Sequence, residues 1–244
     1  MLSGSADLST LAARAPVMPS LDAGPVVLGD VEVMQAAFEL PYASREALLP
    51  RGLHPTTPPL LVVLAWKVRE SPWGPFSMAQ ARVSCRSGVR PRGFVAGCAV
   101  DNAAAATALA AGWGLPAVEG GVQLHRSYDR AELAVALDRS LALQVVGTDP
   151  DPLGTGDVQF TVTTTLAVTP RGLRLVQVEP DYALRRVERV HPQLVAFDGP
   201  AWGLPGVVPG YPVAATIAVG DVTVPRLRFV SRPDVNAFEG TEQV

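Results

Sequence analysis

Gln80 and Arg82 are the residues best placed to do chemistry within the stretch Phe76–Arg86. The stretch alternates as a strand does, so the two side chains share one face. An amide and a guanidinium can polarise a carbonyl or orient an anionic group. We therefore take Gln80 and Arg82 as the candidate catalytic residues. The competing interpretations are that they are satisfied polar groups at the end of a barrel, or that Arg82 pairs with an acid at its rim.

Lys67 is the only lysine of the chain, and its amine is the one side chain able to form a Schiff base. It lies in Leu60–Val68, a continuous apolar run typical of a buried strand. The favoured interpretation is a lysine whose stem covers apolar surface. Glu119 would be a general base if it were buried, but a surface glutamate on a glycine-rich loop is the favoured interpretation.

The cysteines and histidines predict no metal site. Cys85 and Cys98 form no CxxC motif and are expected to be buried, reduced thiols on facing strands, and the three histidines are far apart in sequence. His54 is expected to be a solvated loop residue. Neither Ser84 nor Ser127 has a His/Asp constellation that would indicate a hydrolase. We expect no cofactor.

Many short strands and one convincing helix surround these residues. The helix is capped by Asp101 or Asn102 and is followed by Pro116, which stops it. Strands are predicted on both sides, including Val158–Val168. We predict a mainly β chain, in which residues 1–24 form an N-terminal arm and residues 25–244 form one domain, a barrel with a few short peripheral helices.

Composition narrows the class of protein. The net charge is −3 with scattered basic residues, which argues against nucleic acid or an anionic membrane as a partner. The N-terminus lacks the pattern of a signal peptide, and no apolar run is long enough to cross a bilayer. We therefore expect a cytoplasmic protein that binds a small molecule.

Four segments, in this order, give the chain a resemblance to the acetoacetate decarboxylase family. They are Trp73–Phe76, Val100–Asn102, Trp113–Pro116 and the closing strands within residues 213–230. The resemblance covers most of the chain, from about Val26 to Val230. It implies a single cone-shaped, mostly antiparallel β barrel around a small-molecule cavity. It is also consistent with a homo-oligomer, whose subunit number the sequence leaves open.

The family's chemistry does not carry over with the fold. In the family, two lysines follow the proline. The first forms a Schiff base with a β-keto acid, and its amine is activated by desolvation or by a neighbouring cation. Here the matching positions hold Ala117 and Val118. Two family glutamates correspond to Met78 and Val63, and a family arginine falls near Val31. The coordinated loss indicates a repurposed pocket.

These residues predict an enzyme that has lost decarboxylase chemistry. An apolar pocket suits a polyketide-like substrate of natural-product biosynthesis, and we expect a cyclase that closes a ring by restricting conformation. The alternatives are a non-catalytic barrel that binds an apolar metabolite, and a lyase or decarboxylase rebuilt around Lys67. The expected pocket residues are Val63, Met78, Trp113, Ala117, Val118 and Lys67.

Overall fold

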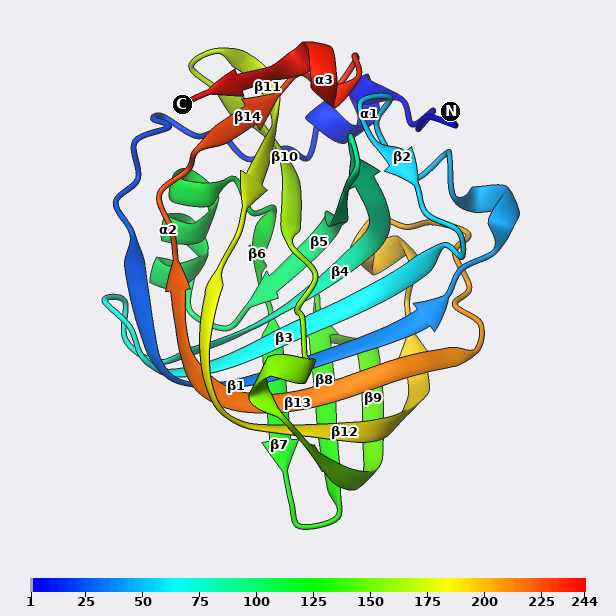
Figure 1. The fold of residues 1–244 in the computed structure, drawn as a ribbon, viewed down its shortest axis with the longest axis vertical. Helices are drawn as coiled ribbons and strands as arrows, with labels where there is room; N and C mark the ends of the chain where they lie inside the picture. The colour runs from blue at the N-terminus through cyan, green and yellow to red at the C-terminus, as the bar shows by residue number, and fades with distance from the viewer. Residues whose placement is uncertain (1) are drawn as a thin grey trace.

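The apolar and alternating runs of the sequence become strands of one curled sheet in the computed structural model, which describes residues 2–244 (Figure 1). The strands are β1 (Val26–Glu39), β2 (His54–Pro55), β3 (Leu60–Glu70), β4 (Phe76–Ser87), β5 (Arg90–Val100), β6 (Ala117–Glu119), β7 (Gly121–Arg126), β8 (Arg130–Leu137), β9 (Ser140–Leu153), β10 (Thr163–Thr169), β11 (Gly172–Val178), β12 (Asp181–Phe197), β13 (Pro212–Val224), β14 (Phe229–Ser231) and β15 (Thr241–Gln243). The α-helices are α1 (Leu8–Ala12), α2 (Ala103–Trp113) and α3 (Ala237–Gly240), and the 3-10 turns are η1 (Tyr42–Ser44), η2 (Thr155–Asp157) and η3 (Pro200–Trp202).

The hydrogen-bonded order of the strands is β15-β14-β11-β10-β5-β4-β3-β1-β13-β12-β9-β8-β7, with β2 on β4 and β6 on β5. Most neighbours are antiparallel, and β5 pairs in parallel with both β10 and β6. The mainly β prediction is confirmed. The hydrogen-bonded sheet curls strongly but does not close on itself, so the structure does not confirm the expected barrel (Figure 1).

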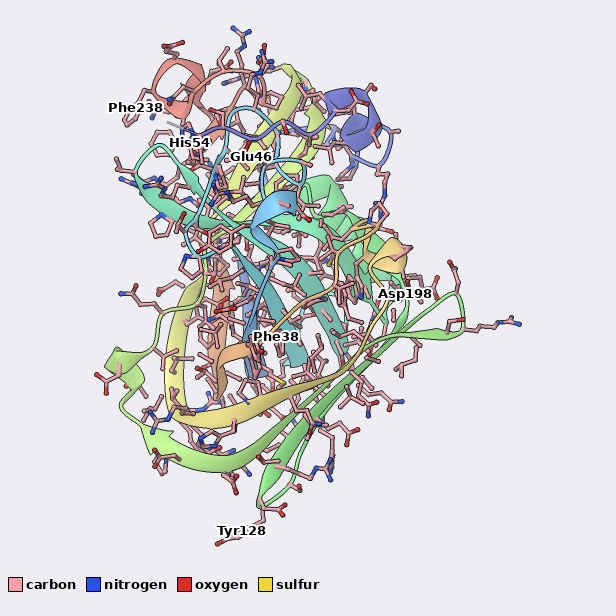
Figure 2. All side chains as sticks on the ribbon, turned by 90° about the vertical axis from the view of Figure 1, so that its right-hand side faces the viewer. Phe38, Glu46, His54, Tyr128, Asp198 and Phe238 are labelled. Carbon is pink, nitrogen blue, oxygen red and sulfur yellow. The ribbon has the colours of Figure 1, made fainter. Side chains whose placement is uncertain are left out.

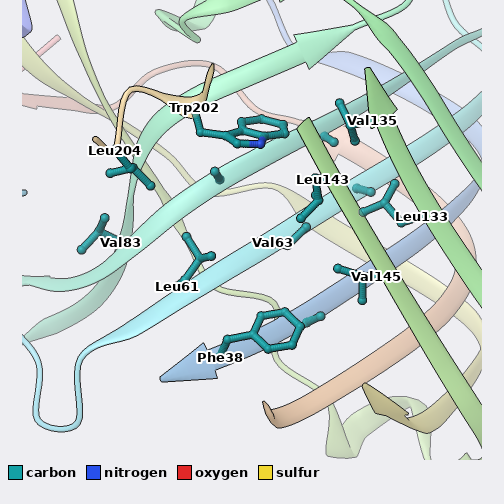
Figure 3. Packing of buried hydrophobic residues seen from close by; sticks show 14 of the residues in the cluster. Phe38, Leu61, Val63, Val83, Leu133, Val135, Leu143, Val145, Trp202 and Leu204 are labelled. Atoms are coloured by element: carbon teal, nitrogen blue, oxygen red, sulfur yellow. The ribbon is translucent and has the colours of Figure 1, made fainter. Parts of the chain in front are cut away.

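The central strands are buried on both faces and separate two apolar clusters. One, the Trp202 cluster, includes Phe38, Val63, Leu143 and Trp202 and fills the space between β3 and the β8–β9 hairpin (Figure 3). The other, the Trp113 cluster, includes Met78 and lies on the opposite face, against α2. Successive residues of β4 therefore point into different clusters, because side chains alternate along a strand.

Helix α2 begins where the sequence predicts, and Asn102 rather than Asp101 caps it. Its side-chain oxygen accepts from the backbone N–H groups of Ala104 (2.9 Å) and Ala105 (3.1 Å). Its amide group donates to the carbonyl oxygens of Trp73 and Pro75, both at 3.2 Å. One side chain thus satisfies the helix N-terminus and fixes the turn before β4.

Gly114 ends α2 in the left-handed region, with φ of 66°. A Cβ atom here would lie 2.9 Å from both the Ala167 Cβ and the Met18 Sδ atoms. We expect Gly114→Ala to lower the free energy of unfolding by about 2–4 kcal/mol, since backbone strain adds to overpacking. Urea unfolding measures this change.

The matched control is Gly112→Ala, near the end of the same helix. Its Cβ would meet only the Ala23 Cβ atom at 3.5 Å, an ordinary contact. Because alanine is the better helix former, this variant should be more stable by about 0.5–1 kcal/mol. Equal losses in both variants would contradict the argument.

Several segments differ from their predicted structure. Residues 158–162 form no strand, and only Thr163–Thr169 of the predicted Val158–Val168 run joins the sheet. His54 is buried rather than solvated, with Nδ1 2.9 Å from the Leu2 carbonyl oxygen, because the N-terminal arm folds back over β2. Figure 2 shows His54 near Phe238, which belongs to α3.

One aromatic side chain stands out on the surface. Tyr128 lies at the tip of the β7–β8 hairpin and is almost fully exposed (Figure 2). Within residues 2–244, no helix has the length and apolar character needed to cross a membrane.

Candidate functional site

Strand β4 presents Met78, Gln80 and Arg82 toward the Trp113 cluster, the shared face predicted from the alternation. Arg82 Nε donates to the Gln80 side-chain oxygen at 2.8 Å, and Gln80 Nε2 lies 3.6 Å from the Met78 sulfur. Arg82 Nη1 donates to the carbonyl oxygen of Thr161. Among the residues that the structure describes, Arg82 Nη2 has no hydrogen-bond partner.

The charge of Arg82 is buried without a carboxylate from residues 2–244 to balance it. The side chain is 0% exposed, and burial lowers its pKa to about 10. The ionisable groups that act on it are Tyr182 and Cys98, whose pKa values burial raises to about 12. All three groups are therefore protonated at neutral pH, so the site carries a net positive charge. Removing such an ion from water costs several kcal/mol.

The segment 158–162 covers this charge. Phe160 is buried, with its ring centroid 4.5 Å from that of Tyr182, and the neighbouring Thr161 carbonyl oxygen accepts the bond from Arg82. The side chain of Gln35 holds the segment in place by accepting from the Thr161 backbone N–H at 2.9 Å. The apolar pattern of the segment predicted a strand, and nothing in it indicated this covering role.

Gly93 provides the room that the Arg82 side chain occupies. A Cβ atom at residue 93 would lie 3.0 Å from the Arg82 Cδ atom and 3.1 Å from the Thr161 Cγ2 atom. The arginine therefore lies against bare backbone of β5. A side chain on Gly93 would push it away from the Thr161 carbonyl oxygen.

The side chains of Ala117 and Val118 point to opposite faces at the start of β6. Ala117 pairs with Cys98 on β5, and Cys98 pairs with Gln80 on β4, so these three residues form one row across the sheet. Ala117 is half-buried and packs against the Trp113 cluster. Val118 points away and is 53% exposed. Of the two positions, only 117 shares a face with the buried arginine.

Val63 and Lys67 lie on the opposite face of the sheet, so the structure does not bring them to Arg82. Val63 belongs to the Trp202 cluster. Lys67, in register for the same face, is half-exposed, and its Nζ atom donates to the Leu124 carbonyl oxygen at 3.3 Å and lies 4.0 Å from a Glu32 oxygen. The ungapped register that placed Val63 in one pocket with Met78 therefore does not describe one site.

Trp113 is a packing residue at the end of α2. It is 3% exposed, its ring N–H donates to the Pro225 carbonyl oxygen at 2.8 Å, and its ring packs edge-on against Trp73 with centroids 6.3 Å apart. Glu119 is exposed, as the surface interpretation predicted. Cys85 and Cys98 are confirmed as buried free thiols.

Lys67 is expected to form no covalent adduct. Borohydride reduction in the presence of pyruvate or acetoacetate should leave the intact mass unchanged, since the amine is engaged at the surface and away from Arg82. Mass spectrometry of the wild-type protein and of Lys67→Ala checks this. A stoichiometric adduct that disappears in Lys67→Ala would make Lys67 the nucleophile.

A cavity of about 290 Å³ opens beside Pro116, and we call it the fork cavity. It lies where β10 and β6 part along the edge of β5, and α1 and the loop after η3 cover it. Most of its lining is apolar; lining residues include Leu11, Arg14, Ala96, Pro116, Leu166 and Leu204. Because the lining comes from segments far apart in the sequence, the sequence did not indicate this cavity.

No acidic, histidine or cysteine cluster within residues 2–244 is arranged to hold a metal ion. The polar side chains grouped around the buried charge are Arg82, Gln80 and Tyr182. A guanidinium in this setting can hold an oxygen that carries, or develops, negative charge.

Comparison with known proteins supports the fold. No family model and no curated protein sequence matches the chain. Among solved structures, acetoacetate decarboxylase from Legionella pneumophila subsp. pneumophila str. Philadelphia 1 is 16% identical, with a TM-score of 0.74 over 84% of this chain and 86% of that one. The enduracididine biosynthesis enzyme MppR, complexed with pyruvate, is 18% identical, with a TM-score of 0.69 over 87% and 97%.

An acetoacetate decarboxylase-like enzyme from Sphingomonas wittichii RW1 is also similar, at 17% identity and a TM-score of 0.65 over 92% of this chain and 98% of that one. These likenesses are far below the identity that transfers an activity, but they span nearly the whole of each chain. The chain has the acetoacetate decarboxylase-like fold.

Proposed function

We propose that the chain is an enzyme of natural-product biosynthesis that has lost Schiff-base chemistry and closes a ring in an apolar, carbonyl-bearing substrate. The observation that carries the proposal is the buried Arg82: among residues 2–244, its charge has no carboxylate partner and its Nη2 atom has no acceptor. It lies on the same face as Ala117, the position that the sequence resemblance aligns with the family's lysine.

An imine and a buried cation can stabilise the same intermediate. When a proton or carbon dioxide leaves the α-carbon of a carbonyl compound, negative charge develops on that carbon, and either group can stabilise it. Ala117 cannot form the imine, whereas Arg82 Nη2 can donate to an enolate oxygen. Such a donor is worth more in a dry site than in water, because little solvent screens it.

Ring closure needs no cofactor and no oxidant. In an aldol-type closure, the enolate carbon attacks a second carbonyl of the same chain, and a new C–C bond forms. The α-proton is replaced by a proton on the new hydroxyl group, so substrate and product are isomers. Holding the chain in a reactive conformation can contribute up to about 7–11 kcal/mol, which suits a pocket rich in apolar side chains.

The biosynthetic role rests on two supports. MppR, which shares this fold, is named as an enzyme of enduracididine biosynthesis. The residues that surround Arg82 are otherwise apolar or neutral, which suits a mostly hydrocarbon substrate better than a small keto acid.

The proposal is tested by incubating the protein with linear polyketone precursors and following isomeric or dehydrated cyclic products by liquid chromatography and mass spectrometry. We expect a rate above that in buffer and no release of carbon dioxide. No rate gain over buffer, across precursors of several lengths, would refute it.

A non-catalytic binding protein is the second candidate. The observation that favours it is the exposed fraction of Gln80 and Arg82, which is 1% and 0%: a substrate must displace segment 158–162 to reach them. Saturable binding of an apolar ligand without any turnover would identify this function.

A further inference from the structure

The fork cavity exists because one stretch of β5 lacks a strand neighbour on one edge. Gly93 and Phe94 pair with β10, and Cys98–Val100 pair with β6. Along the described strands, Val95–Gly97 has no partner between them on that edge. On the other edge, Ala96 is an extra residue in the register with β4, because Ala81 pairs with Gly97 and Arg82 pairs with Val95. Such bulges often lie beside binding sites.

Val95 separates the fork cavity from the buried arginine. It lines the cavity, it is 3% exposed, and it stands directly opposite Arg82 in the β4–β5 ladder. Pro116, on the other side of the opening, immediately precedes Ala117. The other lining residues that belong to a cluster, among them Phe94, Leu166 and Leu204, belong to the Trp202 cluster. The cavity therefore lies on the opposite face of the sheet from Arg82, and Val95 is the lining residue that reaches the face of the arginine.

The two charged groups on the rim of the cavity differ in what they already bind. Both oxygens of Asp7 accept hydrogen bonds from Ser9 and Thr10 at the start of α1, and these bonds hold the pKa of Asp7 far below its usual value. Asp7 is thus committed to capping its own helix.

Arg14, by contrast, forms none of the ion pairs found among residues 2–244. Its guanidinium lies against Gly203, where φ is 73° and an added Cβ atom would collide with it. The left-handed glycine therefore leaves room for a cation at the mouth of an apolar cavity.

We propose that the fork cavity binds an amphipathic carboxylate, with its apolar body between α1 and β5 and its acid group on Arg14. This site is separate from the proposed chemistry, since the cavity and Arg82 lie on opposite faces of the sheet. The ligand class is a chain with an apolar body and one anionic end. A guanidinium recognises a carboxylate through paired N–H donors.

Binding of decanoate and of decanol, measured by titration calorimetry, tests the proposal because the two differ only in the end group. We expect wild-type protein to bind decanoate about fivefold more tightly than decanol, the size of an exposed ion pair. Arg14→Gln should remove this preference and leave decanol binding unchanged. Arg86→Gln, an exposed arginine of β4, is the matched control and should keep the preference.

The location is tested by filling the cavity. Ala15→Phe should weaken both ligands, and Ala47→Phe, on another covering segment, provides a second variant if the first unfolds. Equal affinity of wild-type protein for the two ligands would overturn the proposal. So would unchanged binding in both filled variants, or loss of the preference in Arg82→Met and not in Arg14→Gln.

The outcomes separate this inference from the proposed function. Arg14-dependent binding of decanoate, with no ring closure of any precursor, would leave the cavity assignment standing and refute the cyclase. Ring closure by a wild-type protein that binds decanoate and decanol with equal affinity would support the cyclase and refute the cavity assignment.

Discussion

Replacing Arg82 with methionine is expected to slow ring closure about 10²–10³-fold, the usual cost of one lost donor to a developing oxyanion. The variant removes the charge and the free Nη2 donor together. The effect should fall on kcat, because the donor stabilises negative charge that is absent from the bound ketone. Steady-state kinetics with a linear precursor measures it.

The same variant should fold normally. It leaves the Gln80 oxygen and the Thr161 carbonyl without their shared donor, but it also removes a buried charge that no described carboxylate balances. These contributions oppose one another, so we expect the free energy of unfolding to change by less than about 1 kcal/mol. Arg86→Met, on the exposed part of β4, controls for the loss of an arginine. An Arg82→Met enzyme with more than half the wild-type rate would show that the guanidinium does not act on the substrate.

Placing a lysine at residue 117 should create a Schiff-base site. In Ala117→Lys, the new amine would extend along the row formed with Cys98 and Gln80, on the same face of the sheet as Arg82. Burial and the nearby arginine charge both lower a lysine's pKa, so part of the amine would be neutral, and nucleophilic, near pH 7. Borohydride reduction with pyruvate or acetoacetate should give a stoichiometric adduct, which the wild-type protein lacks.

Val118→Lys is the matched control, because residue 118 is exposed. Its amine should keep an ordinary pKa of about 10.4. We therefore expect little adduct at neutral pH and an increase as the pH rises toward that value, whereas labelling of Ala117→Lys should already be high at neutral pH. Identical pH dependence in the two variants would mean that residue 117 does not face a positive interior.

Local signals in the sequence predicted the local structure well. Asn102 caps α2 and Pro116 follows its end, as the sequence predicts. Capping and turn geometry depend on a few neighbouring residues, so the sequence alone indicates them. The shared face of Gln80 and Arg82 was also predictable, because side chains alternate along a strand and this pattern can be read from neighbouring residues.

Relations between distant segments were not predictable in this way. Both faces of β3 and β4 are apolar, so the pattern could not assign Val63 and Met78 to different clusters. The bulge at Ala96 depends on how β10 and β6 share the edge of β5. Residues 158–162 have the composition of a strand, but Phe160 is buried against Tyr182 instead, since tertiary packing overrides local propensity.

The bare backbone at Gly93 has a consequence for how this chain arose. Even the methyl group of alanine would crowd the Arg82 side chain there, because a Cβ atom would lie 3.0 Å from the Arg82 Cδ atom. We therefore expect the glycine to have preceded the arginine in evolution, or to have arrived with it. Descendants of the same ancestor that carry a bulkier residue at the position of Gly93 should have a different residue in place of Arg82, and the two positions should change together across a lineage.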